Sequence, residues 1–294
     1  MLRGLYTAAA GMMTQQRRHD TVTQNIANMN TTGYKQENSV QRSFPEMLIS
    51  MTGGNPDNPD RTVGKLNTGV FAEESLSPYI QGALKDSGQT TDFALQSNIN
   101  VNDPATGRPM AFDQAGKFIN ANGEVTYRPE AFFTVRDNNG NVRYTRDGHF
   151  QVNGTGALLS STGSAVLDTN GNPIQLTGPV SALKVNERGQ LVDSQSNQLL
   201  GTTLGISVID RPYQLVREGN GNFRLNDTDG ATARMMTAND TVSVRQGYLE
   251  VSNVDAAQSM VDMMAALRAY EANQKVIQFY DKSLDKAVNE VGRV

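Results

Sequence analysis

The stretch AAQSMVDMMAALRAYEANQKVIQFYDKSLDKAVNEV, residues 256–291, decides the fold of this chain. Its apolar side chains recur at alternating steps of four and three residues, which is the heptad pattern of a coiled-coil seam. The seam positions are Ala256, Met260, Met263, Leu267, Tyr270, Gln274, Ile277, Asp281, Leu284, Val288 and Val291. Neither Gly nor Pro occurs between Tyr248 and Val291; Ser252 or Asn253 can cap the start, with Asp255 in the first turn. The pattern predicts a helix of roughly 40 residues, about 60 Å long.

The N-terminal stretch shows the same spacing and predicts a second helix. Its seam positions are Leu5, Ala8, Met12, Gln15, His19, Val22, Ile26 and Met29. The turn residues Asn30–Gly33 then end the pattern, with Gly33 available for a left-handed cap.

The material between the helices has a different character. All the Asn-Gly and Asp-Gly pairs of the chain lie within residues 122–230, and short β-prone runs such as 132–135, 142–145 and 204–209 flank them. Asn-Gly and Asp-Gly suit the two central positions of type I′ hairpin turns. The sequence therefore predicts an α+β protein whose central antiparallel β domain is hairpin-rich, either a partly closed barrel or a meander.

Composition shifts suggest the domain boundaries. Residues 1–35 and 246–294 form the predicted helical coiled-coil domain, and residues 36–70, rich in Pro and Gly, form an extended arm or loop. Residues 71–245 form the predicted β-rich domain, with an inserted segment at about 97–130.

A helix with a heptad seam cannot bury that seam alone, because its stability comes from packing its apolar face. Pairing the two terminal helices leaves a two-helix unit with a small core that other copies can complete, which predicts self-assembly. Periodicity alone leaves a second arrangement open, a monomer in which both helices pack on the β domain.

Composition excludes several classes of function. The 294 residues contain no Cys and two His, and the net charge is -4, so thiol chemistry, His-rich metal sites and phosphate-binding basic stripes are not expected. Asp137–Asn141 and Asp168–Asn172 fit hairpin turns better than calcium loops. We expect no enzyme activity, catalytic residue, cofactor, metal, small-molecule ligand, nucleic acid or membrane insertion. The start MLRGLYTAAAGMM lacks the apolar core of a cleavable signal peptide.

Both ends of the chain resemble a known family. Residues 8–12, 24–28 and 30–35 are similar to the N-terminal signature of flagellar basal-body rod and hook proteins, and residues 246–255 and 260–273 to their C-terminal signature. The run Tyr144–Phe150 resembles their β domain. The signature positions are Asn25, Asn28, Thr31, Gly33, Tyr34, Gly247, Asn253, Arg268, Tyr270 and Glu271. The resemblance is greatest to rod proteins of the FlgG and FlgF type.

This resemblance implies a structural subunit of the bacterial flagellar basal-body rod, outside the cytoplasm, that transmits torque. Its implied partners are copies of itself, other rod and hook subunits, and the flagellar type III export apparatus, which Phe44 and Leu48 of FPEML would contact. The residues expected at the assembly interface are Leu5, Met12, Val22, Ile26, Met260, Met263, Leu267, Tyr270, Ile277 and Leu284.

The sequence departs from the family pattern at one place, because residues 96–131 separate Asp92–Leu95 from Phe132-Phe133. Two other classes of protein stay open: a secreted adhesin or phage-tail-like β protein that its helices oligomerise, and a carbohydrate-active enzyme with a carboxylate pair in the β domain.

Overall fold

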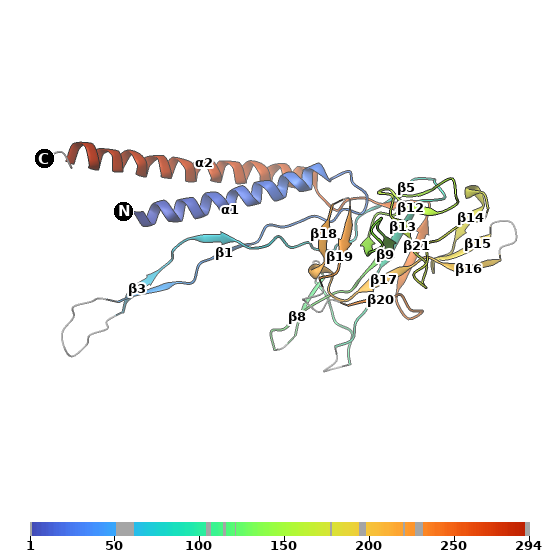
Figure 1. Cartoon of the computed structure of the whole chain (residues 1–294). Coiled ribbons are helices and arrows are strands. Elements are labelled where there is room, and N and C mark those ends of the chain that lie inside the picture. The colour runs from blue at the N-terminus through green and yellow to red at the C-terminus, as the bar shows by residue number, and fades with distance from the viewer. Residues whose placement is uncertain are drawn as a thin grey trace. The chain divides into compact units, whose positions relative to one another are not determined.

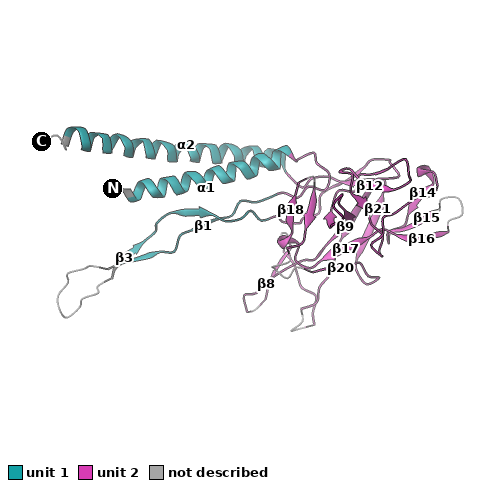
Figure 2. Cartoon of the chain, viewed as in Figure 1, with its two compact units in different colours: residues 1–27, 37–76, 255–294 teal, residues 28–36, 77–254 magenta. Residues whose placement is uncertain are grey.

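The computed structural model describes residues 2–50, 62–103, 107–113, 116–120, 122–176, 178–193, 198–219, 221–226 and 232–291. The chain forms two compact units, shown in two colours in Figure 2. Unit 1 comprises residues 1–27, 37–76 and 255–294, and unit 2 comprises residues 28–36 and 77–254. Each unit is therefore built from segments that lie far apart in the sequence.

Unit 1 contains the two long helices, α1 (Leu2–Ala27) and α2 (Ala256–Lys286), the second followed by a π-helical turn (Ala287–Val291). They run antiparallel and in contact (Figure 1), so the predicted pairing of the terminal helices is confirmed. Gly4 of α1 lies against Tyr280 and Gly11 against Asn273, while Arg18 Nη2 is 2.8 Å from Asp262 Oδ1. The two glycines let the helix backbones approach closely, because a methyl group at Gly4 would overlap the Tyr280 ring.

The ends of the helices differ from the sequence expectation. Asp255 itself caps α2: its Oδ1 accepts the backbone N–H groups of Ala257 at 2.8 Å and Gln258 at 3.1 Å. The expected cap Asn253 instead accepts the backbone N–H of Gln36. Gly33 has the left-handed φ of 68°, but α1 ends at Ala27, so Gly33 does not cap it.

The predicted arm consists of paired antiparallel strands. β1 (Gln41–Ser43) pairs with β4 (Val70–Ala72), and β2 (Met47–Ser50) pairs with β3 (Thr62–Leu66). The arm is bonded to α1, since Thr7 Oγ1 donates to Thr68 O at 3.2 Å and Arg17 Nη1 donates to Ala72 O at 3.3 Å. Asn25 fixes the start of the arm by donating to Glu37 O and accepting from Glu37 N.

Unit 2 is built around an antiparallel sheet of nine strands. Its central strand is β9 (Glu130–Arg136), which pairs with β10, β13 and β17. The other strands are β10 (Val142–Thr145), β11 (Phe150–Val152), β12 (Leu158–Ser160), β13 (Ala165–Val166), β17 (Ile206–Ile209), β18 (Val216–Glu218), β19 (Asn222–Arg224) and β20 (Ala233–Met235). The β-prone runs of the sequence thus form strands, and in the described part of the chain they close no barrel. The predicted α+β class is confirmed.

Smaller ladders complete unit 2. β6 (Phe93–Ser97) pairs with β21 (Val242–Gln246), and β5 (Leu84–Asp86) pairs with β22 (Tyr248–Glu250). The remaining elements are the sheet of β14 (Leu183–Val185), β15 (Gln190–Asp193) and β16 (Leu199–Thr203), the hairpin of β7 (Lys117–Ile119) and β8 (Val125–Tyr127), and the 3-10 turns Val180–Ala182 and Pro212–Gln214.

The core of unit 2 lies where β9 meets β6, β17 and β21. Phe93, Phe133 and Phe150 are fully buried there, with Phe133 and Phe150 packed edge to face at 5.1 Å. Val242 and Val244 of β21 belong to the same cluster. Strand β21, contributed by the end of the β region, is therefore part of the core rather than an addition to its surface.

The hairpin turns use Asn and Gly differently from the predicted type I′ form. In Asp137–Gly140, the N–H of Gly140 donates to Asp137 O, and Asp137 Oδ1 accepts the N–H groups of Asn139 and Asn141. Asn139-Gly140 therefore takes the third and fourth turn positions, with Gly140 at φ 86°. This is a turn led by an Asx side chain and closed by a left-handed glycine. The same pattern recurs at 120–123, 153–156, 168–171 and 186–189.

Gly148 provides a test of this packing. A Cβ atom at Gly148 would lie 1.6 Å from Phe93 O, so we expect Gly148→Ala to lower the free energy of unfolding of unit 2 by about 3 kcal/mol or more. Gly154→Ala is the matched control, because Gly154 has open space around it and its φ is not positive, and it should change stability by less than about 1 kcal/mol. Urea unfolding followed by circular dichroism measures both. Equal effects would contradict the assigned packing of Gly148.

Candidate assembly surface and terminal junction

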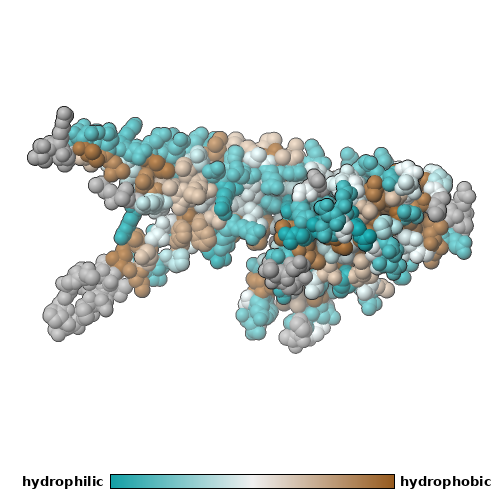
Figure 3. Space-filling model, viewed as in Figure 1, coloured by the Kyte–Doolittle hydropathy of each residue, from teal (hydrophilic) through white to brown (hydrophobic). Residues whose placement is uncertain are grey.

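The helix pair of unit 1 exposes many apolar side chains. Met260, Met264 and Leu267 follow one another at steps of four and three, and they are 53%, 52% and 46% exposed. Among the side chains that the structure describes, the exposed large apolar residues on the helical segments are Tyr6, Met13, Met260, Val261, Met264, Leu267, Val276, Phe279 and Val288. Hydrophobic residues lie along the face of the helix pair shown in Figure 3. A helix pair with this much exposed apolar surface has not completed its core.

The row of α2 that faces α1 is one residue away from the predicted row. Ser259 and Ala266 are 3% and 0% exposed, and Asn273 and Tyr280 follow at the same seven-residue interval against Gly11 and Gly4. The predicted row through Met260, Leu267, Gln274 and Asp281 lies on the neighbouring side of the helix. Hydrophobicity pointed to that side because the close contact along this row uses small and polar residues, whereas the large apolar Met260 and Leu267 beside them are exposed.

The structure places the expected assembly residues in three environments. Val22 is buried, and Met260 and Leu267 are exposed. The others are half-buried: Leu5, Met12, Ile26, Met263, Tyr270, Ile277 and Leu284. The contact of these residues with another copy stays a prediction, and the exposed Met260 and Leu267 are the best placed to make it.

The expected export element lies on the arm of unit 1. Phe44 packs against Phe71, with ring centroids 5.1 Å apart, and Leu48 on β2 is 68% exposed. Its recognition by an export apparatus stays a prediction.

Several signature residues meet in unit 2, where segments 28–36 and 246–254 lie side by side. We call this pair of segments the terminal junction. Gly33 N donates to Glu250 O at 2.8 Å, and Gln36 N donates to Asn253 Oδ1 at 2.7 Å. The Arg217 guanidinium stacks 4.8 Å from the centre of the Tyr34 ring. A Cβ atom at Gly33 would lie 2.5 Å from the carbonyl carbon of Arg146, so glycine is required there both for its φ and for space.

The remaining signature residues have separate positions. Asn28 accepts a hydrogen bond from Thr31 Oγ1, and Gly247 has φ 80° and donates its N–H to Asp92 O. In unit 1, Asn25 binds the backbone of Glu37, while Arg268 and Glu271 are exposed on α2 beside the half-buried Tyr270.

Four buried charges hold the terminal junction, and we call them the buried charge network: Lys35, Glu130, Arg146 and Glu250. Lys35 Nζ lies 2.6 Å from Glu250 Oε1, and Arg146 lies 2.9 Å from Glu250 Oε2. The side chains of Lys35, Arg146 and Glu250 are 2%, 1% and 1% exposed. Glu130, on β9, lies 3.7 Å from Arg146 and accepts a hydrogen bond from Ser97.

The other hydrogen-bonding groups of the network are also satisfied by nearby protein atoms. Lys35 Nζ donates to Ile80 O at 2.7 Å, Arg146 Nη1 donates to Ala131 O at 2.6 Å, and Gly82 N donates to Glu250 Oε1 at 2.8 Å. Arg146 Nη2 also donates to Gln81 Oε1. Breaking one partner of such a buried pair typically costs about 3–5 kcal/mol, because the other charge is left uncompensated.

Burial and neighbouring charge set the protonation of these groups. Burial, together with Arg146, lowers the pKa of Lys35 from 10.5 to about 8, against the opposing effect of Glu250 and Glu130. Burial raises the pKa of Glu130. Burial also favours the neutral form of Glu250, but Arg146 and Lys35 outweigh it, so the pKa of Glu250 lies below its usual value.

The sequence contains only a weak signal for the buried charge network. Lys35, Arg146 and Glu250 lie within the motifs Gly33-Tyr34-Lys35, Arg146-Asp147-Gly148 and Tyr248-Leu249-Glu250. Each of these three charged residues lies in or next to a short extended segment and within a few residues of a glycine. Only the folded structure shows that the three side chains share one buried site, because they come from opposite ends and the middle of the chain.

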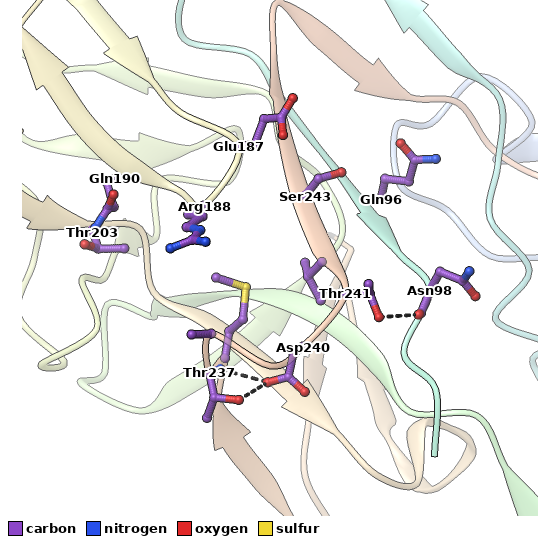
Figure 4. A pocket seen from close by; sticks show the side chains of 13 residues that line it. Gln96, Asn98, Glu187, Arg188, Gln190, Thr203, Thr237, Asp240, Thr241 and Ser243 are labelled. Atoms are coloured by element: carbon purple, nitrogen blue, oxygen red, sulfur yellow. Dashed lines mark hydrogen bonds between the residues drawn. The ribbon is translucent and has the colours of Figure 1, made fainter. Parts of the chain in front are cut away.

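Unit 2 also has an open polar pocket of about 620 Å³, beside β21. Figure 4 shows Arg188, Gln190 and Thr203 on one side of it and Asn98 and Thr241 on the other. Two carboxylates line it, Glu187 and Asp240, and Asp240 forms a two-point ion pair with Arg234 that lowers the pKa of Asp240. A glycoside hydrolase needs a general acid of raised pKa facing its substrate. Asp240 is poorly suited to that role, and Glu130, whose pKa is raised, is enclosed in the buried charge network.

Comparisons with known proteins agree with the motifs at both ends. Residues 5–35 match the family described as flagella basal body rod protein, residues 129–193 the FlgE/F/G hook protein D1 domain, and residues 245–290 the C-terminal region of flagellar basal body rod FlgEFG proteins.

Relatives match along nearly the whole chain. The flagellar hook-basal body complex protein FlhO of Bacillus subtilis is 34% identical, with both chains covered completely. The basal-body rod protein FlgG of the same species is 26% identical over 98% of this chain and 99% of the relative, and FlgF of Mesorhizobium japonicum is 28% identical over 99% of each.

The paired terminal helices, the β unit and these matches define a structural, non-enzymatic component of the bacterial flagellum. The chain belongs to the flagellar hook-basal body rod family of FlgE, FlgF and FlgG. In the part of the chain that the structure describes, neither helix has the length and apolar character needed to cross a membrane.

The lowered pKa of Lys35 predicts a pH effect on unit 2. Unfolded Lys35 keeps its proton up to about pH 10.5, whereas the folded protein loses it near pH 8, so the unfolded state binds more protons between these values. The contribution of Lys35 to the free energy of unfolding should therefore rise with pH above about 8, by at most about 3 kcal/mol. Urea unfolding between pH 7 and 10 gives the free energy of unfolding of the wild type and of Lys35→Met, and the difference between the two isolates the contribution of Lys35. If this difference stays constant or falls as the pH rises, the lowered pKa of Lys35 is contradicted.

Proposed function

We propose that this chain is a subunit of the flagellar basal-body rod, exported by the flagellar type III apparatus and assembled through its terminal helices into a helical rod that transmits torque. The main support is the exposed apolar row Met260, Met264 and Leu267 on a helix of 31 residues. A row of this kind is stable in water when another copy covers it. The likeness to the basal-body rod proteins FlgG and FlgF supports the same function.

The position of the subunit along the axis is part of this proposal. The relatives include rod proteins of both the FlgG and the FlgF type and the hook-basal body complex proteins FlhO and FlhP. We infer a place in the rod rather than the hook, since rod-type relatives cover nearly the full length of the chain. The alternatives of an adhesin or a phage-tail-like protein lack any comparable full-length likeness among these relatives.

Leu267→Asp tests assembly through the helices. Leu267 is 46% exposed and lies beside Ala266, which faces α1, so the substitution should leave the α1–α2 pair folded and prevent copies from packing. We expect unchanged helical circular dichroism of the purified protein, loss of incorporation into basal bodies and loss of motility. Lys275→Asp, at an exposed polar position of the same helix, is the control and should assemble normally. Normal motility of Leu267→Asp would refute assembly through this face.

Phe44 and Leu48 test recognition by the export apparatus. We expect Phe44→Ala and Leu48→Ala each to reduce secretion of the chain at least several-fold at equal cellular levels, measured by immunoblotting culture supernatants of a strain that cannot assemble the rod. Met47→Ala is the matched control, because Met47 is 60% exposed on the same strand but lies outside the two-residue pattern. Equal secretion of all three variants and the wild type would show that Phe44 and Leu48 contribute to the structure of the arm and not to recognition by the export apparatus.

A further inference from the structure

The terminal junction joins the beginning and the end of unit 2. Lys35 and Glu250 are 215 positions apart in the sequence, yet their side chains form one ion pair inside this unit. Glu250 is the common acceptor: its carboxylate receives Lys35, Arg146 and Gly82 N, and its backbone carbonyl receives Gly33 N. A single residue near the end of the chain thus contacts three separate segments of the β unit, around residues 33–35, 82 and 146.

Without Glu250, the interior of unit 2 would contain the cations Lys35 and Arg146 with Glu130 as the remaining carboxyl group of the buried charge network. Glu130 lies 3.7 Å from Arg146, and its burial raises its pKa and so disfavours the ionised form that could balance them. Backbone carbonyls at Ile80 and Ala131 cannot replace a negative charge. Such an arrangement is unfavourable because a buried charge without a partner has lost its hydration, and no ion pair compensates for that loss.

The strands next to Glu250 are also required by the core. Strand β21 places Val242 and Val244 in the main hydrophobic cluster, and β22 pairs with β5. The β unit therefore lacks one side of its core and the counter-ion of its buried cations until residues 242–250 are in place.

We propose that Glu250 acts as an interlock on folding: unit 2 reaches its native packing only after the segment containing Glu250 has joined Lys35 and Arg146. A chain made from its N-terminus would then keep its β region unfolded until almost all of it has been synthesised. If the chain is exported as proposed above, the same interlock would keep it unfolded and able to pass through the export apparatus, a consequence that rests on the proposed function.

Hydrogen exchange of the full-length purified chain tests the interlock. In Glu250→Gln, amide exchange should accelerate on the order of 100-fold or more in segments 28–36, 84–86, 130–136 and 142–152 together. Asp240→Asn is the matched control, because Asp240 is also held by an arginine in unit 2, but that arginine is 43% exposed, so the substitution leaves no buried cation without a partner and should change exchange only nearby. Acceleration confined to 246–254 in Glu250→Gln, or equal effects of the two variants, would overturn the proposal.

A second variant covers the case in which Glu250→Gln does not fold. The double variant Lys35→Met with Glu250→Gln removes one buried cation together with the anion. Its amides in the same segments should therefore exchange at least about tenfold more slowly than those of Glu250→Gln alone. No recovery would show that charge balance is not the cause. The order of folding is tested by protease pulses during synthesis in vitro: full-length chains should yield a resistant β fragment, whereas incomplete chains ending near residue 240 should be digested. Resistant incomplete chains would refute the interlock. These measurements need no flagellum, so they can fail without affecting the assigned assembly role.

Discussion

The structure of the β unit depends on one constraint, the burial of Lys35 and Arg146 around the carboxylate of Glu250. These side chains are almost completely shielded from water, so each charge needs its partner in place. Because the partners come from residues 35, 146 and 250, satisfying them brings the two ends of the β region and its central hairpin together. The close fit of Gly33 against the Arg146 backbone belongs to the same arrangement.

Unit 1 shows the opposite condition. Its two helices pack closely against each other, because Gly4 and Gly11 leave room for Tyr280 and Asn273. On the outside of the pair, the apolar side chains of Met260, Met264 and Leu267 remain exposed to water. The β unit is thus complete within one chain, whereas the helical unit has apolar surface left for further contacts. This division agrees with membership of a family of structural flagellar subunits.

Sequence periodicity identified the helices correctly and misplaced one row of α2 by a single residue. The reason is physical: hydrophobicity marks where large apolar groups lie, but Met260 and Leu267 of the predicted row are exposed, while the neighbouring Ser259 and Ala266 form the close contact. The turns show a similar limit. Asn-Gly pairs correctly predicted hairpins, but the preceding Asp or Asn side chain set the turn type by binding two backbone N–H groups, as Asp137 does.

The sequence by itself determined the class of fold, the two terminal helices, many of the strands and the family. These follow from local spacing and local motifs, which act over a few residues and can be read without knowing what lies nearby in space. Only the tertiary structure decided the roles of Lys35, Arg146 and Glu250 and which row of α2 makes the close contact with α1. Those features depend on contacts between residues as much as 215 positions apart, and a charged residue looks the same in the sequence whether water or a buried partner surrounds it.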